Sequence, residues 1–171
     1  MDQDRERVEK KMLRKLMEKD TEYMKEWMSD KSITNNFQID FSVYTEEKIK
    51  SFIENSYSDV NQHFAFVDVN DTYLGTVSLK NISYKNRNAE YAIVTRKIAQ
   101  GTGAAERATK EVLEYAFKKL MLEKVYLNVL EENIRANRFY KRCGFELEGR
   151  AKHHICINGV FHNLNWYAIY R

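Results

Sequence analysis

The segment Gln100-Gly101-Thr102-Gly103-Ala104-Ala105 lies between a strand-like stretch and a helix-like stretch. Residues 89–95 before it are mostly apolar, and residues 106–120 after it place apolar side chains at helical spacing. This pattern predicts a strand, a short loop and a helix, with Gly101 and Gly103 permitting a sharp turn. Several backbone N–H groups and the positive end of a helix dipole would then converge on one point, where a pyrophosphate fits.

The loop taken alone allows three interpretations. A P-loop requires a second glycine followed by Lys-Ser/Thr, and no such residues follow Gly103. A dinucleotide-binding loop requires a third glycine where Glu106 stands, and it usually follows the first strand of a βαβ unit. An ordinary strand-to-helix turn is the third interpretation. A second motif is needed to choose among them.

That second motif is Asn133-Ile134-Arg135-Ala136-Asn137-Arg138-Phe139-Tyr140-Lys141-Arg142-Cys143-Gly144-Phe145, which follows the strand-like residues 125–130. Together, Gln-x-x-Gly-x-Ala and Asn-x-x-Ala-x-x-x-Tyr-x-x-x-Gly-Phe resemble the GNAT superfamily of N-acetyltransferases in order and approximate spacing. The resemblance is specific over residues 87–149 and extends to the rest of the chain by element order. Residues 147–150 and the Asn158-Gly159 turn look closest to the Rim-type and spermidine acetyltransferase branch.

The predicted element order is β-α-α-β-β-β-α-β-α-β-β. With the resemblance, it implies an α/β (α+β) GNAT acyl-CoA N-acyltransferase fold, whose central mixed, mostly antiparallel sheet is flanked by helices. We expect the first strand to end near Lys19 and Asp20 or Thr21 to cap the first helix. Polar connections are expected at 29–36 and 80–88. The remaining expected strands are 63–69, 72–78, Glu146–Ile157 and Val160–Tyr170.

Composition indicates one soluble domain over residues 1–171, with residues 1–10 expected to fray. Because the net charge is only +3 and the basic residues are scattered, we expect no nucleic-acid binding. No apolar run approaches a membrane span, and the first twenty residues lack the apolar core of a signal peptide. A cytoplasmic protein without a membrane partner is therefore expected.

The histidines and cysteines do not form a metal-binding pattern. His153 and His154 are neighbours on a predicted strand and therefore point to opposite faces. No ligand spacing typical of zinc is present, so no metal is expected. Cys143 and Cys156 are expected to be free thiols, and Cys143 is expected to have a packing role.

Acetyl transfer to an amine needs a base for the amine proton, an N–H donor for the carbonyl oxygen and an acid for the leaving thiolate. The resemblance implies that Tyr140 is the general acid. It also implies that Glu90, in an otherwise apolar strand, is the base, either directly or through water. The alternatives are that Tyr140 is an ordinary core tyrosine and that Glu90 faces solvent.

The resemblance further implies acetyl-CoA as the co-substrate. The expected contact residues are Ile93, Val94, Thr95, Gln100, Gly101, Thr102, Gly103, Ala104, Ala105, Asn133 and Ala136. Asn133 is also expected to cap a helix, and the strand around Ile93 must separate from its neighbour near Leu127. Glu106 would place negative charge beside the phosphates, which Arg96, Lys97 and Arg107 could offset.

The predicted function is transfer of the acetyl group of acetyl-CoA to the primary amine of a small molecule, an amino sugar or a protein N-terminus. The alternative is a non-catalytic acyl-CoA-binding sensor or partner-binding module. We expect the acceptor to lie against residues 29–44 and the hairpin around Asn158. Phe37, Phe41 and Tyr44 there, with the acids Asp30 and Asp40, favour a cationic or partly apolar amine. The last two strands are candidates for pairing in a homodimer.

Overall fold

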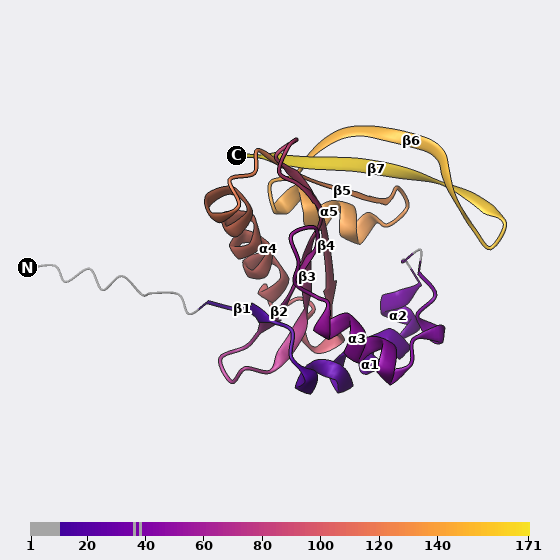
Figure 1. Ribbon diagram of the computed structural model, residues 1–171. Coiled ribbons are helices and arrows are strands. Elements are labelled where there is room, and N and C mark those ends of the chain that lie inside the picture. Colours follow the sequence, from indigo (N-terminus) through magenta and orange to yellow (C-terminus); the bar gives the residue numbers. More distant parts are fainter. Residues whose placement is uncertain (1–10, 36, 38) are drawn as a thin grey trace, which may run out of the picture.

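The computed structural model describes residues 11–35, 37 and 39–171 (Figure 1). Within them lies a seven-stranded sheet in the order β1-β2-β3-β4-β5-β7-β6. The strands are β1 (Leu13–Lys15), β2 (Gln62–Val67), β3 (Tyr73–Ser83), β4 (Asn88–Thr95), β5 (Lys124–Leu130), β6 (Glu146–Ile157) and β7 (Val160–Tyr170). Only β4 and β5 pair in parallel, which confirms the mixed, mostly antiparallel sheet. The expected fraying of residues 1–10 lies outside the described residues.

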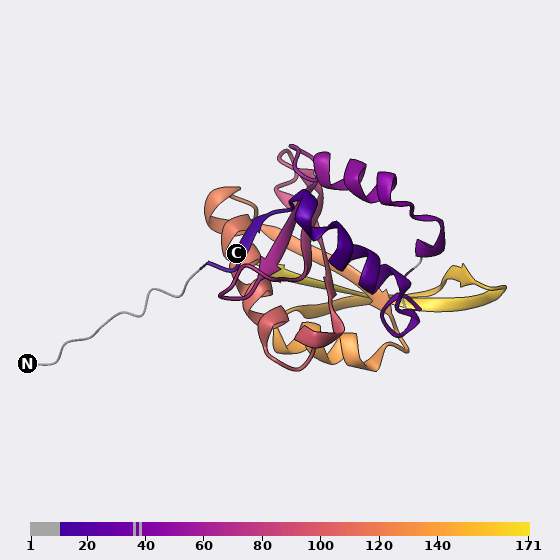
Figure 2. The ribbon, with the colours of Figure 1, turned by 90° about the horizontal axis from the view of Figure 1, so that it is seen from below.

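Helices cover both faces of the sheet (Figures 1 and 2). They are α1 (Thr21–Ser29), α2 (Lys31–Thr34) and α3 (Glu46–Glu54) on one face, and α4 (Ala104–Glu114) and α5 (Ile134–Arg142) on the other. Alternation along β2 sends Phe64 and Phe66 into the core under α4, and Ala65 and Val67 into the core under α1 and α3. Among the described helices, none is both long and apolar enough to cross a membrane.

Two segments predicted as polar connections are partly regular. Residues 29–36 contain α2, because Asp30 accepts a hydrogen bond from the Ser32 N–H at 2.8 Å and Ile33 is buried. Strand β3 continues to Ser83, because Ile82 is buried in the core. Between β1 and β2, the described residues therefore form three α-helices rather than the predicted two.

The backbone conformation of single residues determines where several of the other elements begin and end. Helix α4 begins at Ala104, before the predicted start, because Gly103 has a φ of 79° and ends the loop. After Glu114 the chain continues as a π-helical turn, Tyr115–Lys119. Asn158 and Gly159 have φ values of 51° and 79°, which suits a two-residue hairpin turn. The predicted bounds of β6 and β7 are confirmed, and their hairpin extends beyond the other strands (Figure 1).

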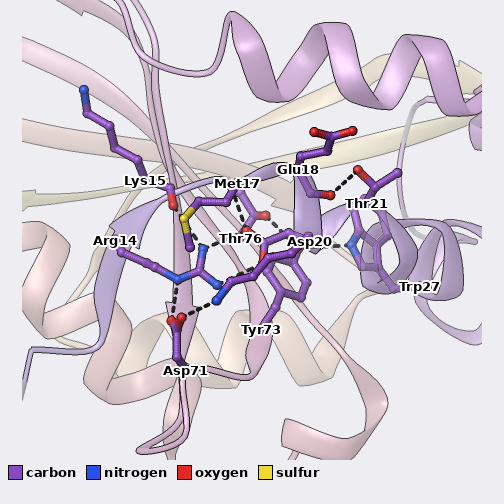
Figure 3. Close-up of polar contacts among 11 residues, drawn as sticks. Arg14, Lys15, Met17, Glu18, Asp20, Thr21, Trp27, Asp71, Tyr73 and Thr76 are labelled. Atoms are coloured by element: carbon purple, nitrogen blue, oxygen red, sulfur yellow. Dashed lines mark hydrogen bonds and ion pairs between the residues drawn. The ribbon is translucent and has the colours of Figure 1, made fainter.

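A cluster of charged side chains joins β1 to the start of α1 and to the β2–β3 turn (Figure 3). Arg14 donates hydrogen bonds to both carboxylate oxygens of Asp20, at 2.7 and 2.9 Å, and also pairs with Asp71. The Met17 N–H donates to the same buried Asp20 carboxylate at 2.9 Å. Neither Asp20 nor Thr21 caps α1 through its side chain, contrary to the prediction. Strand β1 accordingly ends at Lys15, earlier than predicted.

Replacing Asp20 with alanine should lower the free energy of unfolding by about 2 kcal/mol, because Arg14 and the Met17 N–H both lose a buried acceptor. Urea unfolding measures this change. Glu114→Ala is the control, since it breaks only the exposed pair with Lys118 and should leave stability nearly unchanged. Equal stability of the two variants would contradict this role for Asp20.

Candidate functional site

Strands β4 and β5 separate soon after they begin. Their parallel ladder has three residue pairs and ends at Glu90 and Tyr126. Beyond it β4 runs on to Thr95, paired with β3 in unbroken register. Among the described residues, the edge of β4 that faces β5 therefore has no strand partner from Tyr91 to Thr95. The separation predicted near Leu127 is present, and no bulge interrupts this part of β4.

Gly75 of β3 lies close to this part of β4. A Cβ atom on Gly75 would stand 2.2 Å from the carbonyl oxygen of Val94 and 2.5 Å from the ring of Phe66. Only glycine fits between them without a shift of the neighbouring atoms. The missing side chain at Gly75 thus permits the close pairing of β3 with the last residues of β4.

The loop after β4 leaves several backbone donors free. The Thr102 hydroxyl donates to the Ala99 carbonyl at 2.7 Å and accepts from the Ala104 N–H at 3.3 Å. From residue 101 to residue 106, four backbone N–H groups have no hydrogen-bond acceptor among the described residues. They belong to Gly101, Gly103, Ala105 and Glu106. Free N–H groups at the start of a helix can bind an anion, so the loop has the geometry that the predicted pyrophosphate site needs, and the site itself stays a prediction.

Side chains of α5 contact the same loop. Arg135 donates to the Gln100 side-chain oxygen at 2.9 Å, and Arg142 lies 3.0 Å from the carboxylate of Glu106. Arg142 therefore balances the charge of Glu106. Arg96, which was expected to offset Glu106, is instead buried and pairs with Glu26 at 2.7 Å. The sequence analysis missed both α5 arginines, because nothing local indicates that α5 lies beside the loop.

Tyr140 lies on α5 among other aromatic rings. Its ring centroid is 6.1 Å from that of Tyr91, 6.0 Å from that of Phe145 and 6.4 Å from that of Tyr167. In the described residues its hydroxyl has no hydrogen-bond partner. Burial, with a smaller effect of Cys143, raises the pKa of Tyr140 to about 12. The phenol is therefore protonated at neutral pH, as a general acid must be.

Asn137, which the sequence analysis missed, fixes the start of α5. Its side-chain nitrogen donates to the carbonyl groups of Leu130 and Asn133, at 3.0 and 2.8 Å. Its side-chain oxygen accepts hydrogen bonds at 2.9 Å from both Asn165 and the Tyr167 hydroxyl. A single buried amide thus connects the end of β5, the first turn of α5 and β7. It positions the helix that carries Tyr140.

Glu90 lies on the opposite face of the sheet from Tyr140. Ala89 and Tyr91 belong to the core under α4, so Glu90 between them points the other way. Its carboxylate accepts from the Lys80 ammonium at 2.9 Å and from the Asn81 side chain at 2.9 Å. The side chain is 21% exposed, so it is neither buried nor fully solvated. Glu90 lies where β4 and β5 begin to separate.

The other predicted contact residues lie on β4 and at the start of α5. Asn133 caps α5, because its side-chain oxygen accepts from the Ala136 N–H at 3.2 Å, and Ala136 packs against the core. Ile93 packs toward the α4 side of the sheet and Val94 toward the α1 side, while Thr95 ends β4. The predicted cap at Asn133 is confirmed.

Cys143, His153 and His154 make packing contacts. Burial raises the pKa of the Cys143 thiol to about 11, so it is a poor nucleophile at neutral pH. Cys143 packs against the core, as expected, and both cysteines are free. His153 stacks on Phe161, and His154 contacts Trp166 edge to face. Across residues 11–35, 37 and 39–171, no three His, Cys, Asp or Glu side chains are placed to hold a metal ion.

A cavity of about 840 Å³ lies between the α1–α3 region and the tip of the β6–β7 hairpin. Phe37, Phe41 and Tyr44 line one side, and Ile157 and Asn158 line the other. Figure 1 shows the hairpin tip and α2 on the same side of the molecule. The two segments expected to contact the acceptor are therefore brought together by the fold.

Comparison with known proteins places the chain in a family. The family model for the acetyltransferase (GNAT) domain matches residues 11–146. The chain is 32% identical to spermidine N(1)-acetyltransferase of Vibrio cholerae over 78% of this chain and 80% of that protein. It is 35% identical to spermidine N(1)-acetyltransferase of Escherichia coli K12 over 69% of this chain and 67% of that protein.

Solved structures agree with this assignment. The crystal structure of spermidine N-acetyltransferase from Vibrio cholerae in complex with CoA and spermine has a TM-score of 0.83 and 27% sequence identity to this chain. The match covers 92% of this chain and 94% of the other. The chain therefore belongs to the GNAT acetyltransferase family and is an N-acetyltransferase that transfers the acetyl group of acetyl-CoA to a primary amine.

Proposed function

We propose that acetyl-CoA binds with its pyrophosphate at the loop Gln100–Ala105 and its pantetheine arm along the free edge of β4. The observation that carries this proposal is the set of four N–H groups without acceptors at the start of α4. From Tyr91 to Thr95 the unpaired edge spans roughly 13 Å, along which an extended arm can bond as a strand would. The thioester then lies where β4 and β5 part.

This position of the thioester assigns the general acid to Tyr140 and the general base to Glu90. Tyr140 gives its proton to the departing CoA thiolate from one face of the sheet. Glu90 receives the proton of the amine from the other face, directly or through water. An N–H group on the free edge formed by Ile93, Val94 and Thr95 stabilises the negative carbonyl oxygen of the tetrahedral intermediate. Asn133 and Ala136 place the first turn of α5 against the same region.

The electrostatic surroundings of the loop support binding of an anion. Glu106 alone would repel a phosphate, but its charge is balanced by Arg142. Arg107 lies beside Gly103, with a guanidinium nitrogen 3.3 Å from the position that a Cβ would take. We therefore propose that Glu106 does not prevent acetyl-CoA binding. The cytoplasmic location and the homodimer stay predictions.

The acceptor is proposed to be a primary amine that approaches from the α1–α3 side. The relatives named above act on spermidine, and the solved complex contains spermine. A non-catalytic acyl-CoA sensor would keep the loop but would not need Tyr140 or Glu90. Release of CoA thiol in the presence of amines separates a catalyst from a sensor.

Gly103→Glu should abolish saturable binding of acetyl-CoA in a calorimetric titration. The new side chain brings negative charge and a strained positive φ to the centre of the free N–H groups. Gly159→Glu is the matched control, because Gly159 has the same φ of 79° at the distant hairpin turn. Normal binding by Gly103→Glu would show that the loop is only a turn.

Tyr140→Phe should lower kcat by about 10²-fold or more, with the dissociation constant of acetyl-CoA within about twofold of the original. The ring remains packed, and only the proton donor is lost. Since the pKa of Tyr140 is about 12, its ionisation should cause no decline of kcat up to about pH 10. Tyr84→Phe, on the exposed β3–β4 turn, is the control. An unchanged kcat would remove Tyr140 from the mechanism.

Glu90→Gln should lower kcat about 10²-fold at neutral pH, because the amide cannot accept the proton of the amine. The deficit should shrink as the pH rises toward the amine pKa of about 10, where the amine is already neutral. Steady-state rates from pH 6 to pH 10 measure this trend. Lys80→Met keeps the carboxylate and should retain most of the rate. A deficit that is constant across this range would argue that Glu90 is not the base.

A further inference from the structure

Two aromatic side chains, Tyr126 of β5 and Trp166 of β7, lie on the face of the sheet that carries Glu90. Tyr126 pairs with Glu90 at the end of the β4–β5 ladder, and its ring centroid is 6.3 Å from that of Trp166, at an angle of 31°. The next residues along their strands, Leu127 and Tyr167, belong to the core under α4, so both rings point to the other face. We call these two rings the aromatic wall. It stands where β4 and β5 begin to separate.

The aromatic wall is open to a ligand. Among the described residues, the core under α1 and α3 takes side chains from β2, β3 and β4 and none from β5 or β7. Both rings of the wall are only half-buried. Within the same residues, neither the Tyr126 hydroxyl nor the Trp166 indole N–H has a hydrogen-bond partner. Tyrosine and tryptophan usually find such a partner when they pack in a protein, so the wall has both apolar surface and polar groups available for a ligand.

The charges around Glu90 are already paired. Its carboxylate lies 2.9 Å from the Lys80 ammonium, so its attraction for a second ammonium group is reduced. Lys124, on the same side of β5 as the wall, is paired with Glu148 at 2.7 Å and adds little repulsion. Aromatic ring faces attract cations without carrying a net charge themselves. The wall therefore offers an incoming ammonium group the attraction that the paired carboxylate lacks.

We propose that the aromatic wall of Tyr126 and Trp166 binds the ammonium group of the acceptor and holds it beside Glu90. This inference rests on the proposed function, in which Glu90 is the base. An N–H bond of the ammonium breaks, its electron pair stays on nitrogen, and the proton goes to the Glu90 carboxylate, directly or through water. The neutral amine no longer carries the charge that the rings attract. It can then leave the wall for the thioester between β4 and β5.

Steady-state kinetics with spermidine, which carries primary ammonium groups, test the role of the wall. Trp166→Leu should raise the KM for spermidine about fivefold, with kcat and the dissociation constant of acetyl-CoA within about twofold of the original. Trp166→Phe keeps a ring face and should stay within about twofold in KM. Phe161→Leu is the control, because it removes an exposed ring of β7 that stacks on His153. A KM that Trp166→Leu leaves unchanged would overturn the inference.

Intrinsic fluorescence tests the same binding without turnover. The chain has two tryptophans, and Trp27 is buried and donates to the Tyr73 hydroxyl at 3.2 Å, so Trp166 is the one that a ligand can contact. Spermidine added at constant ionic strength should change the fluorescence in a saturable way, and Trp166→Phe, which retains Trp27, should abolish the change. No change in the original protein up to about 10 mM, above the usual range of KM values, would overturn the inference. A change that persists in Trp166→Phe would also overturn it.

The outcomes separate this inference from the proposed function. Thiol release that Trp166→Leu leaves unaffected would overturn the inference and leave acetyl transfer intact. No thiol release with any amine, from protein that binds acetyl-CoA and shows the fluorescence change, would overturn the proposed function and the delivery of the amine to Glu90. Binding of the ammonium group at the aromatic wall would then be retained.

Discussion

The short ladder between β4 and β5 is the constraint on which the rest of the site depends. Two parallel strands that stayed paired along their length would leave no free edge for a ligand, whereas these part after Glu90 and Tyr126. The separation does not need a break in β4, because β3 holds that strand in register to Thr95. Gly75 permits the close contact between them. One edge of β4 thus has backbone N–H and C=O groups that no described strand pairs with, and these groups can form hydrogen bonds with a ligand.

The second strand of the pair is held away from β4 by its own contacts. β5 pairs with β7 from Lys124 to Leu130, and the amide of Asn137 joins the end of β5 to α5 and β7. Because Tyr140 lies one turn further along α5, the network that fixes the strand also fixes the phenol. The region between the strands is therefore bounded by rigid elements, as precise chemistry requires.

The loop after β4 and the cavity beside the β6–β7 hairpin carry different charged groups. At the loop after β4, free N–H groups and nearby arginines suit an anion, and Arg142 balances Glu106. At the cavity beside the hairpin, the aromatic side chains Phe37, Phe41 and Tyr44 lie beside polar groups that include Lys25, Lys31 and Asp40. The segments proposed to contact the acceptor lie outside the two motifs.

Sequence reasoning succeeded wherever structure depends on neighbours in the chain. The glycine loop, the cap at Asn133 and the Asn158-Gly159 turn follow from backbone conformations and side chains within a few positions, and the structure confirms them. The spacing of the two motifs was enough to indicate the family and its mixed sheet. It also indicated Tyr140 and Glu90, whose roles stay proposals.

The sequence by itself determined the local turns, the order of most elements and the family. Each of these depends on residues that are close together in the chain. Only the tertiary structure decided that Arg142 rather than Arg96 balances Glu106, and that Asn137 joins three elements. It also decided which charges line the cavity between α2 and the hairpin. These facts depend on side chains far apart in the chain, and their partners are settled by how the helices pack on the sheet.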